Sequence, residues 1–251
     1  MDCVSLLSTL SGLPKQRIKD AMTKGAVILK RKQGKRLRRA KETLRTGDRL
    51  SLHYDDQILA LTPPSGSYCL KHLKSYSVWF KAAGIMSQGT AFGDHLAITR
   101  IAEVALNRPI FLVHRLDRET AGILLLAHTK ATAAKLSKLF EQHKISKVYE
   151  ASVLGKTDPQ GTIEQPLDGK SATTHYRCIR FDPTTQQSHL QIHIETGRLH
   201  QIRRHLAWID HPVIGDPRYG QGNKNREGLQ LKAVELSFIC PESNQRVTYR
   251  L

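Results

Sequence analysis

The segment HRLDRETAGILLLAHTK, residues 114–130, constrains the fold most strongly, because dense charge stands directly before an apolar run. Asp117 lies between Arg115 and Arg118, and the apolar residues 123–127 follow within a few positions. Such a run is typical of a buried strand, so we predict a strand, a tight polar loop and a second strand. A loop held by two buried strands is a common place for catalytic groups. A structural ion pair of Asp117 with either neighbouring arginine explains the charge equally well.

The charge of the chain is large and unevenly distributed. The 251 residues carry a formal charge of +17 with a pI of about 9.9, and 39% of them are hydrophobic. Residues 1–54 hold 14 Lys and Arg against 4 Asp and Glu, whereas the remaining residues hold 25 against 18. A clustered excess of this size favours a separate basic module that binds nucleic acid. The alternative is a generally basic surface that keeps the protein soluble.

The basic module has a regular pattern. Residues 14–25 predict a helix that ends at Gly25, and residues 26–39 predict a strand, a basic turn at Gly34 and a second basic segment. Residues 44–54 predict a closing strand. We expect the basic side chains to contact RNA phosphates, namely Lys15, Arg17, Lys19, Lys30, Arg31, Lys32, Lys35 and Arg36.

Residues 1–54 resemble the small RNA-binding domain named after a small-subunit ribosomal protein, the S-four type. The helix with its basic face, the K-G-A-V-I-L turn into a strand and the T-G-D-R-L-S-L close carry this resemblance. The usual Arg-Leu-Asp opening is missing, and the hairpin is unusually basic. The polar, turn-forming TPPSGS at 62–67 predicts a linker over 55–74. From residue 75 the sequence has strand and helix patterns with ordinary charge, which predicts a second domain over 75–251.

Neither metal nor membrane is expected. Cys3, Cys69, Cys178 and Cys240 are scattered, without the spacing of a zinc site or a disulfide framework. Residues 1–13 lack the pattern of a signal peptide, and no apolar run reaches the roughly 18 residues of a spanning helix. We therefore expect a cytoplasmic protein, with monomer as the default state.

Two later stretches add candidate site residues. Residues 145–156 predict a strand that carries Tyr149, a residue that in a strand is more often a packing residue. Residues 189–220 predict a strand, a turn and a helix over 199–210. Arg198, Arg203 and Arg204 surround the start of that helix, and their simplest interpretation is a phosphate-binding face.

Three histidines in the same stretch do not favour a metal site. His200, His205 and His211 follow one another at spacings of five and six residues. These spacings put consecutive members on different faces of a helix, and the last lies beyond the helix.

Together these stretches resemble the RluA-type family of pseudouridine synthases. HRLDRETAG is similar to the H-R-L-D-R-x-T-S-G signature, and SKVYEASVLG is similar to the strand that carries the active-site tyrosine. TGRLHQIRRHLAWIDHPVIGDPRYG resembles T-G-R-x-H-Q-I-R followed by H-P-I-x-G-D-x-x-Y, and WFKAAGIMSQGT resembles the N-K-P-A-G segment. Ala82 replaces the usual proline and Ala121 the usual serine.

The resemblance implies an α+β fold, in which helices flank a mixed, mainly antiparallel sheet. It implies that Asp117 is the catalytic carboxylate, that Arg203 lies beside it, that Tyr149 stacks on the target uracil and that Arg115 fills the space which the flipped base leaves. Asp117 must be ionised, and a cationic neighbour favours that form. Whether it attacks the sugar or removes a proton stays open. No cofactor is expected, and Arg115, Arg118, Arg198 and Arg204 join the expected RNA contacts.

The resemblance implies RNA as the partner, with large-subunit ribosomal RNA as the first choice and transfer RNA as the second. Two other classes remain open. One is a non-catalytic RNA-binding or ribosome-assembly protein that keeps the synthase scaffold. The other is a DNA-binding or repair glycosylase, which would also flip a base toward a carboxylate.

Overall fold

A computed structural model of the chain describes residues 2–220, 223 and 225–251. The chain divides into two compact units. Unit 1 comprises Met1–Pro64 and Met86–Arg108, and unit 2 comprises Ser65–Ile85 and Pro109–Leu251. Among the described residues, no helix has the length and apolar character needed to cross a membrane.

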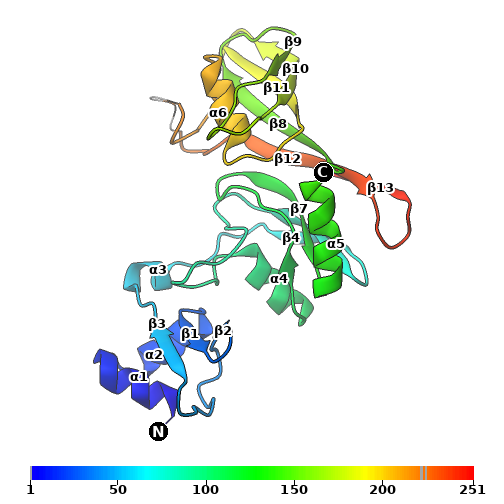
Figure 1. Ribbon diagram of the computed structural model, residues 1–251. Coiled ribbons are helices and arrows are strands. Elements are labelled where there is room, and N and C mark those ends of the chain that lie inside the picture. The colour runs from blue at the N-terminus through cyan, green and yellow to red at the C-terminus, as the bar shows by residue number, and fades with distance from the viewer. Residues whose placement is uncertain (1, 221–222, 224) are drawn as a thin grey trace. The chain divides into compact units, whose positions relative to one another are not determined.

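Among its described residues, unit 1 joins four short helices to a small antiparallel sheet. Figure 1 shows the first two helices and the strands β1 and β2 at the blue end of the chain. The sheet has the strand order β2-β1-β3, and the side chains between it and the first two helices form the core of the unit. The elements are α1 (Cys3–Ser11), α2 (Lys15–Thr23), β1 (Val27–Lys30), β2 (Gly34–Arg36), β3 (Arg49–Leu52), α3 (Asp56–Ala60) and α4 (Ile98–Leu106).

The sequence pattern predicted one helix and two strands of this unit. The helix expected at 14–25 is α2, and Gly25 follows it with a φ of +82°, a conformation that favours glycine. The expected strands are β1 and β3, while Gly34 opens β2 instead of forming the turn.

Residues 86–108 were expected in the second domain, but they lie in unit 1. Asp94 is the reason: its backbone N–H donates to the carbonyl of Lys24 at 2.9 Å. Its carboxylate lies 3.1 Å from Arg36 Nε and also binds Arg38. Asp94 thus ties this segment to the basic hairpin, together with the hydrogen bond from Arg36 Nη2 to the carbonyl of Thr90 at 2.7 Å.

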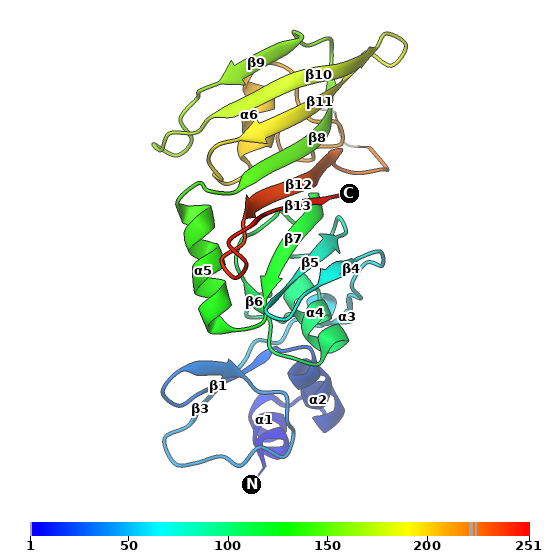
Figure 2. The same cartoon turned by 90° about the vertical axis from the view of Figure 1, so that its right-hand side faces the viewer.

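Unit 2 is built on a ten-stranded sheet, which Figure 2 shows face on. The strand order is β4-β5-β7-β12-β8-β11-β10-β9, with β6 paired to β7 and β13 paired to β12. Only the β7–β12 pair among the described strands is parallel, which confirms the predicted α+β class with a mainly antiparallel sheet. The strands are β4 (Tyr68–His72), β5 (Tyr76–Lys81), β6 (Phe111–Leu112), β7 (Ala121–Ala127), β8 (Ser146–Leu154), β9 (Gln160–Ile163), β10 (Thr174–Asp182), β11 (Gln187–Ile194), β12 (Leu231–Ile239) and β13 (Arg246–Arg250).

Helices α5 (Lys130–Glu141) and α6 (Gln201–Trp208) lie on opposite faces of this sheet (Figures 1 and 2). Apolar residues of β5, β7 and α5 form one core, and apolar residues of β8, β10, β11 and α6 form the other. The apolar run at 123–127 is fully buried within β7, so it anchors the charged loop that precedes it.

The segment expected as a linker, 55–74, contains two regular elements, α3 and β4. β4 pairs antiparallel with β5, and the ring of Tyr68 stacks on Phe80 with centroids 5.3 Å apart. The sequence pattern did not indicate β4, because an edge strand has only one neighbouring strand and therefore exposes more of its side chains.

Gly122 is part of β7. Its φ is +126°, and a Cβ at this position would lie 2.2 Å from the carbonyl oxygen of Ala233. Glycine is therefore required where β7 and β12 approach each other. This contact fixes the end of the charged loop against the centre of the sheet.

Candidate active site

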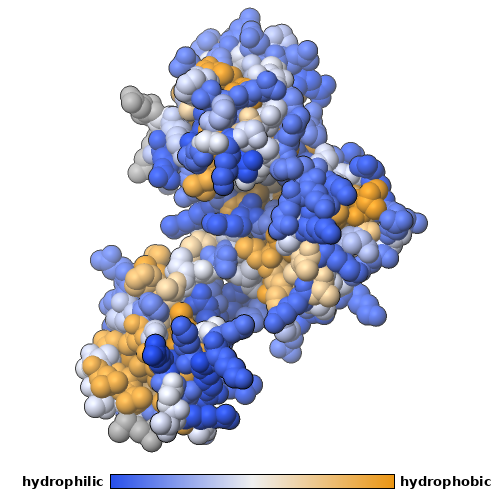
Figure 3. All heavy atoms as spheres, in the orientation of Figure 1, coloured by the Kyte–Doolittle hydropathy of each residue, from blue (hydrophilic) through white to orange (hydrophobic). Residues whose placement is uncertain are grey.

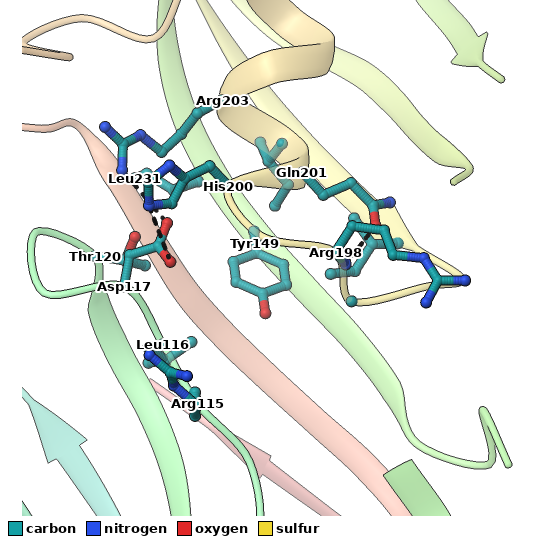
Figure 4. Close-up of a pocket in the computed structure, with 13 residues that line it drawn as sticks. Arg115, Leu116, Asp117, Thr120, Tyr149, Arg198, His200, Gln201, Arg203 and Leu231 are labelled. Atoms are coloured by element: carbon teal, nitrogen blue, oxygen red, sulfur yellow. Dashed lines mark hydrogen bonds and ion pairs between the residues drawn. The ribbon is translucent and has the colours of Figure 1, made fainter. Parts of the chain in front are cut away.

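Unit 2 contains a pocket of about 90 Å³ into which the charged loop presents Asp117. Figure 4 shows Asp117 facing His200 and Arg203, with the ring of Tyr149 beside them. Arg115 and Arg198 also line the pocket. Three parts of the chain that lie far apart in the sequence thus meet here: the charged loop, β8, and the 197–200 turn with the helix α6 that follows it.

Asp117 is held by partners from the far end of the chain. Its Oδ2 accepts a hydrogen bond from the Nη1 of Arg203 at 3.4 Å, and its Oδ1 lies 3.8 Å from His200 Nε2. Arg118 instead donates from Nε to the carbonyl of Gly84. Within the described residues neither Arg115 nor Arg118 forms an ion pair with Asp117, so the local ion pair that the sequence allowed is not present.

Arg203 has a second partner, which the sequence did not reveal. Its Nε and Nη2 each donate to one oxygen of Asp216 at 2.8 Å, and the exposed fractions of the two side chains are 2% and 0%. Two nitrogens of the Arg203 guanidinium are thus bonded to Asp216, and the third, Nη1, makes the longer hydrogen bond to Asp117. A two-point Arg–carboxylate pair is rigid, so Asp216 fixes where Arg203 presents its charge to Asp117.

The two charges of this pair stabilise each other despite their burial. Burial alone would raise the pKa of Asp216, but Arg203 and the backbone N–H groups of Arg218 and Tyr219 hold it below its ordinary value. Burial alone would likewise lower the pKa of Arg203, but Asp216, assisted by Asp117, raises it. The pocket therefore keeps a permanent cation beside Asp117.

His200 is a further residue that the sequence did not identify as part of the site. Its backbone is left-handed, with a φ of +53°, which is uncommon for a residue other than glycine and concentrates at functional sites. Its Nδ1 lies 2.8 Å from the hydroxyl of Tyr219. Burial is the main reason that the pKa of His200 lies below its ordinary value; Asp117 opposes this shift and Arg203 adds to it. A neutral imidazole thus faces the carboxylate at neutral pH.

Gln201 fixes the turn that precedes α6. Its side-chain oxygen accepts from the hydroxyl of Thr196 at 2.6 Å and from the backbone N–H of Arg198 at 3.0 Å. Its amide donates to Thr173 and Thr174. The helix predicted at 199–210 is present as the shorter α6, Gln201–Trp208. Its polar residues Gln201, Arg203 and His205 can be buried because each has specific hydrogen-bond partners.

Lys81 stabilises the charged loop through a hydrogen bond to its backbone. It is fully buried, and its ammonium donates to the carbonyls of Ala82, Ile85 and Arg118 at 2.8–3.2 Å. Burial lowers the pKa of Lys81 to about 8. The N–H of Gly84 also donates to the carbonyl of Arg118 at 2.8 Å. The K-A-A-G segment, residues 81–84, therefore holds the loop that carries Asp117 through hydrogen bonds to its backbone.

The departure from proline at Ala82 has a structural consequence. The backbone N–H of Ala82 donates to the hydroxyl of Ser67 at 2.9 Å. A proline has no N–H and could not form this bond. The substitution therefore gains a contact with the strand connection that precedes β4.

Tyr149 projects from β8 into the pocket (Figure 4). Burial and, to a smaller extent, the charge of Asp117 raise the pKa of its hydroxyl. The phenol stays protonated across the physiological range. The ring can offer a stacking face to a base, whereas a phenolate that would accept a proton is strongly disfavoured.

The predicted RNA contacts in unit 2 fall into different environments. Arg115 is exposed and lines the pocket, and Arg198 lines it while its Nε donates to the carbonyl of Ser171 at 3.0 Å. Arg118 is exposed but bonded to Gly84. Arg204 is directed to Asp168, with two hydrogen bonds of 2.9 and 3.1 Å, and it does not line the pocket.

The predicted contacts in unit 1 lie mostly at its surface. Figure 3 shows a hydrophilic area on the side of the hairpin and an apolar area over α1. Four arginines and lysines already hold acids: Arg17 binds Asp56, Arg31 binds Asp48 and Glu42, Lys35 lies 3.7 Å from Glu42, and Arg36 binds Asp94. The side chains left exposed without an acidic partner among the described residues are Lys15, Lys19, Lys30 and Lys32.

The three histidines of 200–211 have separate partners. His205 is buried between Thr174 Oγ1 and the carbonyl of Gln165, each at 2.9 Å, and His211 contacts the carbonyl of Leu154 at 2.8 Å. Across residues 2–220, 223 and 225–251, no three His, Cys, Asp or Glu side chains are grouped as metal ligands.

The chain is similar to proteins of known class. Residues 75–208 match the family model described as RNA pseudouridylate synthase. Ribosomal large subunit pseudouridine synthase D of Zymomonas mobilis is 35% identical over 163 residues, which are 55% of this chain and 51% of that protein. tRNA pseudouridine synthase C of Haemophilus ducreyi is 29% identical over 240 residues, with 78% of this chain and 88% of that protein covered.

A solved structure shares the fold. The human RNA pseudouridylate synthase domain containing 1 superposes with a TM-score of 0.65 at 21% identity, over 76% of this chain and 86% of that one. The family model takes in more than half of the chain and includes the charged loop, Tyr149 and Arg203. This chain belongs to the RNA pseudouridylate synthase family, isomerases that act on RNA.

Proposed function

We propose that the chain converts specific uridines of a structured RNA to pseudouridine, with Asp117 as the catalytic carboxylate. One observation carries this proposal: the pocket brings Asp117, Arg203 and Tyr149 together from three distant segments. A non-catalytic scaffold would have no need to keep a carboxylate between a fixed cation and a neutral histidine in a partly open pocket. A DNA glycosylase is disfavoured by the family match.

The isomerisation of uridine to pseudouridine needs few groups besides those of this pocket. The bond from the ribose C1′ to uracil N1 breaks, the base turns, and C1′ bonds to C5. The proton that C5 loses is balanced by one that N1 gains, so no redox step or energy source is needed. A carboxylate next to the sugar can attack C1′ or remove a sugar proton, and in both roles the positive charge of Arg203 lies beside it.

The target uridine must leave its stack to reach Asp117. Tyr149 offers its ring to the flipped base. Arg115, exposed at the edge of the pocket, is in position to occupy the space that the base vacates. Unit 1 supplies the wider grip on phosphates through its exposed lysines, in the manner of an S-four-type domain.

Large-subunit ribosomal RNA is the first candidate target, because the Zymomonas mobilis relative that is named for it is 35% identical. Transfer RNA is the second, because the Haemophilus ducreyi relative named for it aligns over more of the chain, 78% against 55%.

Pseudouridine mapping across total RNA tests this proposal directly. RNA from cells with and without the gene is compared, and a site that disappears without the gene and returns with it identifies the target. Complementation with Asp117→Asn provides the control. If all sites persist without the gene, the proposed activity is wrong; the RNA that carries the lost site decides between the two targets.

A further inference from the structure

A second cavity lies next to the Asp117 pocket, within unit 2. Its volume is about 650 Å³, against about 90 Å³ for the pocket. The two share part of their walls, namely Arg115, Tyr149, Ile194, Gly197 and Arg198. A strand whose target base enters the pocket can therefore reach this cavity with a neighbouring nucleotide.

Lys147 is a buried cation in the wall of this cavity. Its side chain is 8% exposed, and its ammonium donates to the carbonyl of Thr196 at 3.3 Å. Within the described part of the chain, no carboxylate lies within 4.0 Å of it. An ammonium has three hydrogens to donate, and a buried charge is costly unless an anion compensates it. Burial lowers the pKa of Lys147 to about 8.

His114 adds a fixed donor and a flat face to the same wall. Its Nε2 accepts a hydrogen bond from the backbone N–H of Leu125 at 2.9 Å. Burial, followed by the charge of Lys147, lowers the pKa of His114 to about 3. The imidazole is thus neutral and carries its hydrogen on Nδ1. The ring stacks on Phe140, with centroids 4.2 Å apart and an interplanar angle of 21°.

The remaining charges around the cavity are mainly positive. Arg115 and Arg198 line the side shared with the pocket, and Glu141 is the one acid among the residues that line the cavity. Donors and cations facing a hollow of this size match an anion with several acceptor oxygens. In an RNA strand, the phosphate group has that chemistry.

We propose that this cavity binds a phosphate of the RNA strand next to the target uridine, with Lys147 as its buried anchor. The proposal rests on the proposed function, because it assumes that RNA enters the Asp117 pocket. The phosphate then supplies the anion that the described residues do not place within 4.0 Å of the Lys147 ammonium. The alternative is that Lys147 only holds the Thr196 carbonyl and so positions the turn.

Binding of a short oligouridylate to the full chain separates these two roles. Affinity is measured by fluorescence anisotropy over a range of salt concentrations, for the wild type, Lys147→Gln and Lys147→Arg. Lys144→Gln is the matched control, since Lys144 is an exposed lysine three residues away. Loss of one phosphate contact should weaken binding about tenfold and reduce the salt slope by about 0.7, the value for a single strand. Lys147→Arg should retain the slope, and Lys144→Gln should change it less.

A second measurement needs no variant that might misfold. Each phosphate of the oligouridylate is replaced in turn by a neutral methylphosphonate. The wild type should lose most affinity at one linkage, and that linkage should have no further effect in Lys147→Gln.

If all linkages behave alike, or if folded Lys147→Gln keeps the wild-type slope, the phosphate site is wrong. Neither measurement requires turnover, so a wild type that forms no pseudouridine would overturn the proposed function alone.

Discussion

Arg203 and Arg204 are neighbours on α6, and each grips an aspartate with two hydrogen bonds. The distances are nearly the same, 2.8 and 2.8 Å from Arg203 to Asp216 against 2.9 and 3.1 Å from Arg204 to Asp168. Their surroundings are opposite. The first pair is 2% and 0% exposed, whereas the second is 25% and 68% exposed.

The difference shows that burial, more than geometry, decides what an ion pair does. Water screens the Arg204 pair and competes for its hydrogen bonds, so either partner can be lost at little cost. The Arg203 pair has no such substitute, and Asp117 depends on the same guanidinium. The charge pattern gave both arginines a phosphate-binding role, whereas the family resemblance placed Arg203 beside Asp117, which it contacts. The phosphate-binding role of Arg204 stays a prediction.

The largest effect should come from Arg203→Gln. The change leaves Asp216 as a buried charge without its partner, which should lower the free energy of unfolding by about 3–5 kcal/mol. Pseudouridine formation should fall below detection, because Asp117 loses its cation. Arg204→Gln is the matched control and should unfold like the wild type in a denaturant titration. Equal losses in both variants would refute the contrast between the two pairs.

Acid should weaken the wild type more than Asp216→Asn. The pKa of Asp216 in the folded protein lies below its ordinary value of 3.8. Its stabilising contribution is therefore complete above that value and is lost as the pH falls through the folded pKa. The difference in stability between the wild type and Asp216→Asn should narrow below about pH 4.

Asp168→Asn provides the exposed counterpart. The pKa of Asp168 is also lowered, by its hydrogen bonds to Arg204, but solvent screens this pair. Thermal unfolding followed from pH 7 to acid should show little change for this variant. A difference between wild type and Asp216→Asn that stays constant down to the acid limit would contradict the assignment of a buried, ionised Asp216.

A smaller effect is expected from Tyr219→Phe. The change removes the hydroxyl that contacts His200 Nδ1 at 2.8 Å, while the ring that lies 5.2 Å from the Arg203 guanidinium remains. A single hydrogen bond contributes about 1 kcal/mol, so turnover should fall several-fold. If His200 orients Asp117, kcat should drop with little change in KM. A rise in KM alone would instead give Tyr219 a role in binding RNA.

The sequence predicted the parts of this site that leave a local pattern. The apolar run after Asp117 indicated β7, and the motif residues indicated Asp117, Tyr149 and Arg203. No role was assigned to Asp216, although it is the aspartate of the H-P-I-x-G-D-x-x-Y segment. Neither periodicity nor charge in that polar turn distinguishes a buried acid from an exposed one.

Burial caused the other omissions as well. Lys81 and Lys147 resemble any other lysines in the sequence, yet both are buried and their environments lower the pKa of each to about 8. β10 was missed because two arginines and a histidine interrupt its apolar positions. Which polar residues leave the solvent depends on contacts between strands that a local pattern does not encode.

The central claim is that Asp117 performs the chemistry while Arg203 and Asp216 hold the charge beside it. The most direct test is single-turnover pseudouridine formation by Asp117→Asn on the RNA identified by mapping. Asparagine keeps the shape of the side chain but cannot be ionised, so turnover should vanish while RNA affinity stays within a few-fold of the wild type. Measurable turnover by a homogeneous Asp117→Asn preparation would contradict the account.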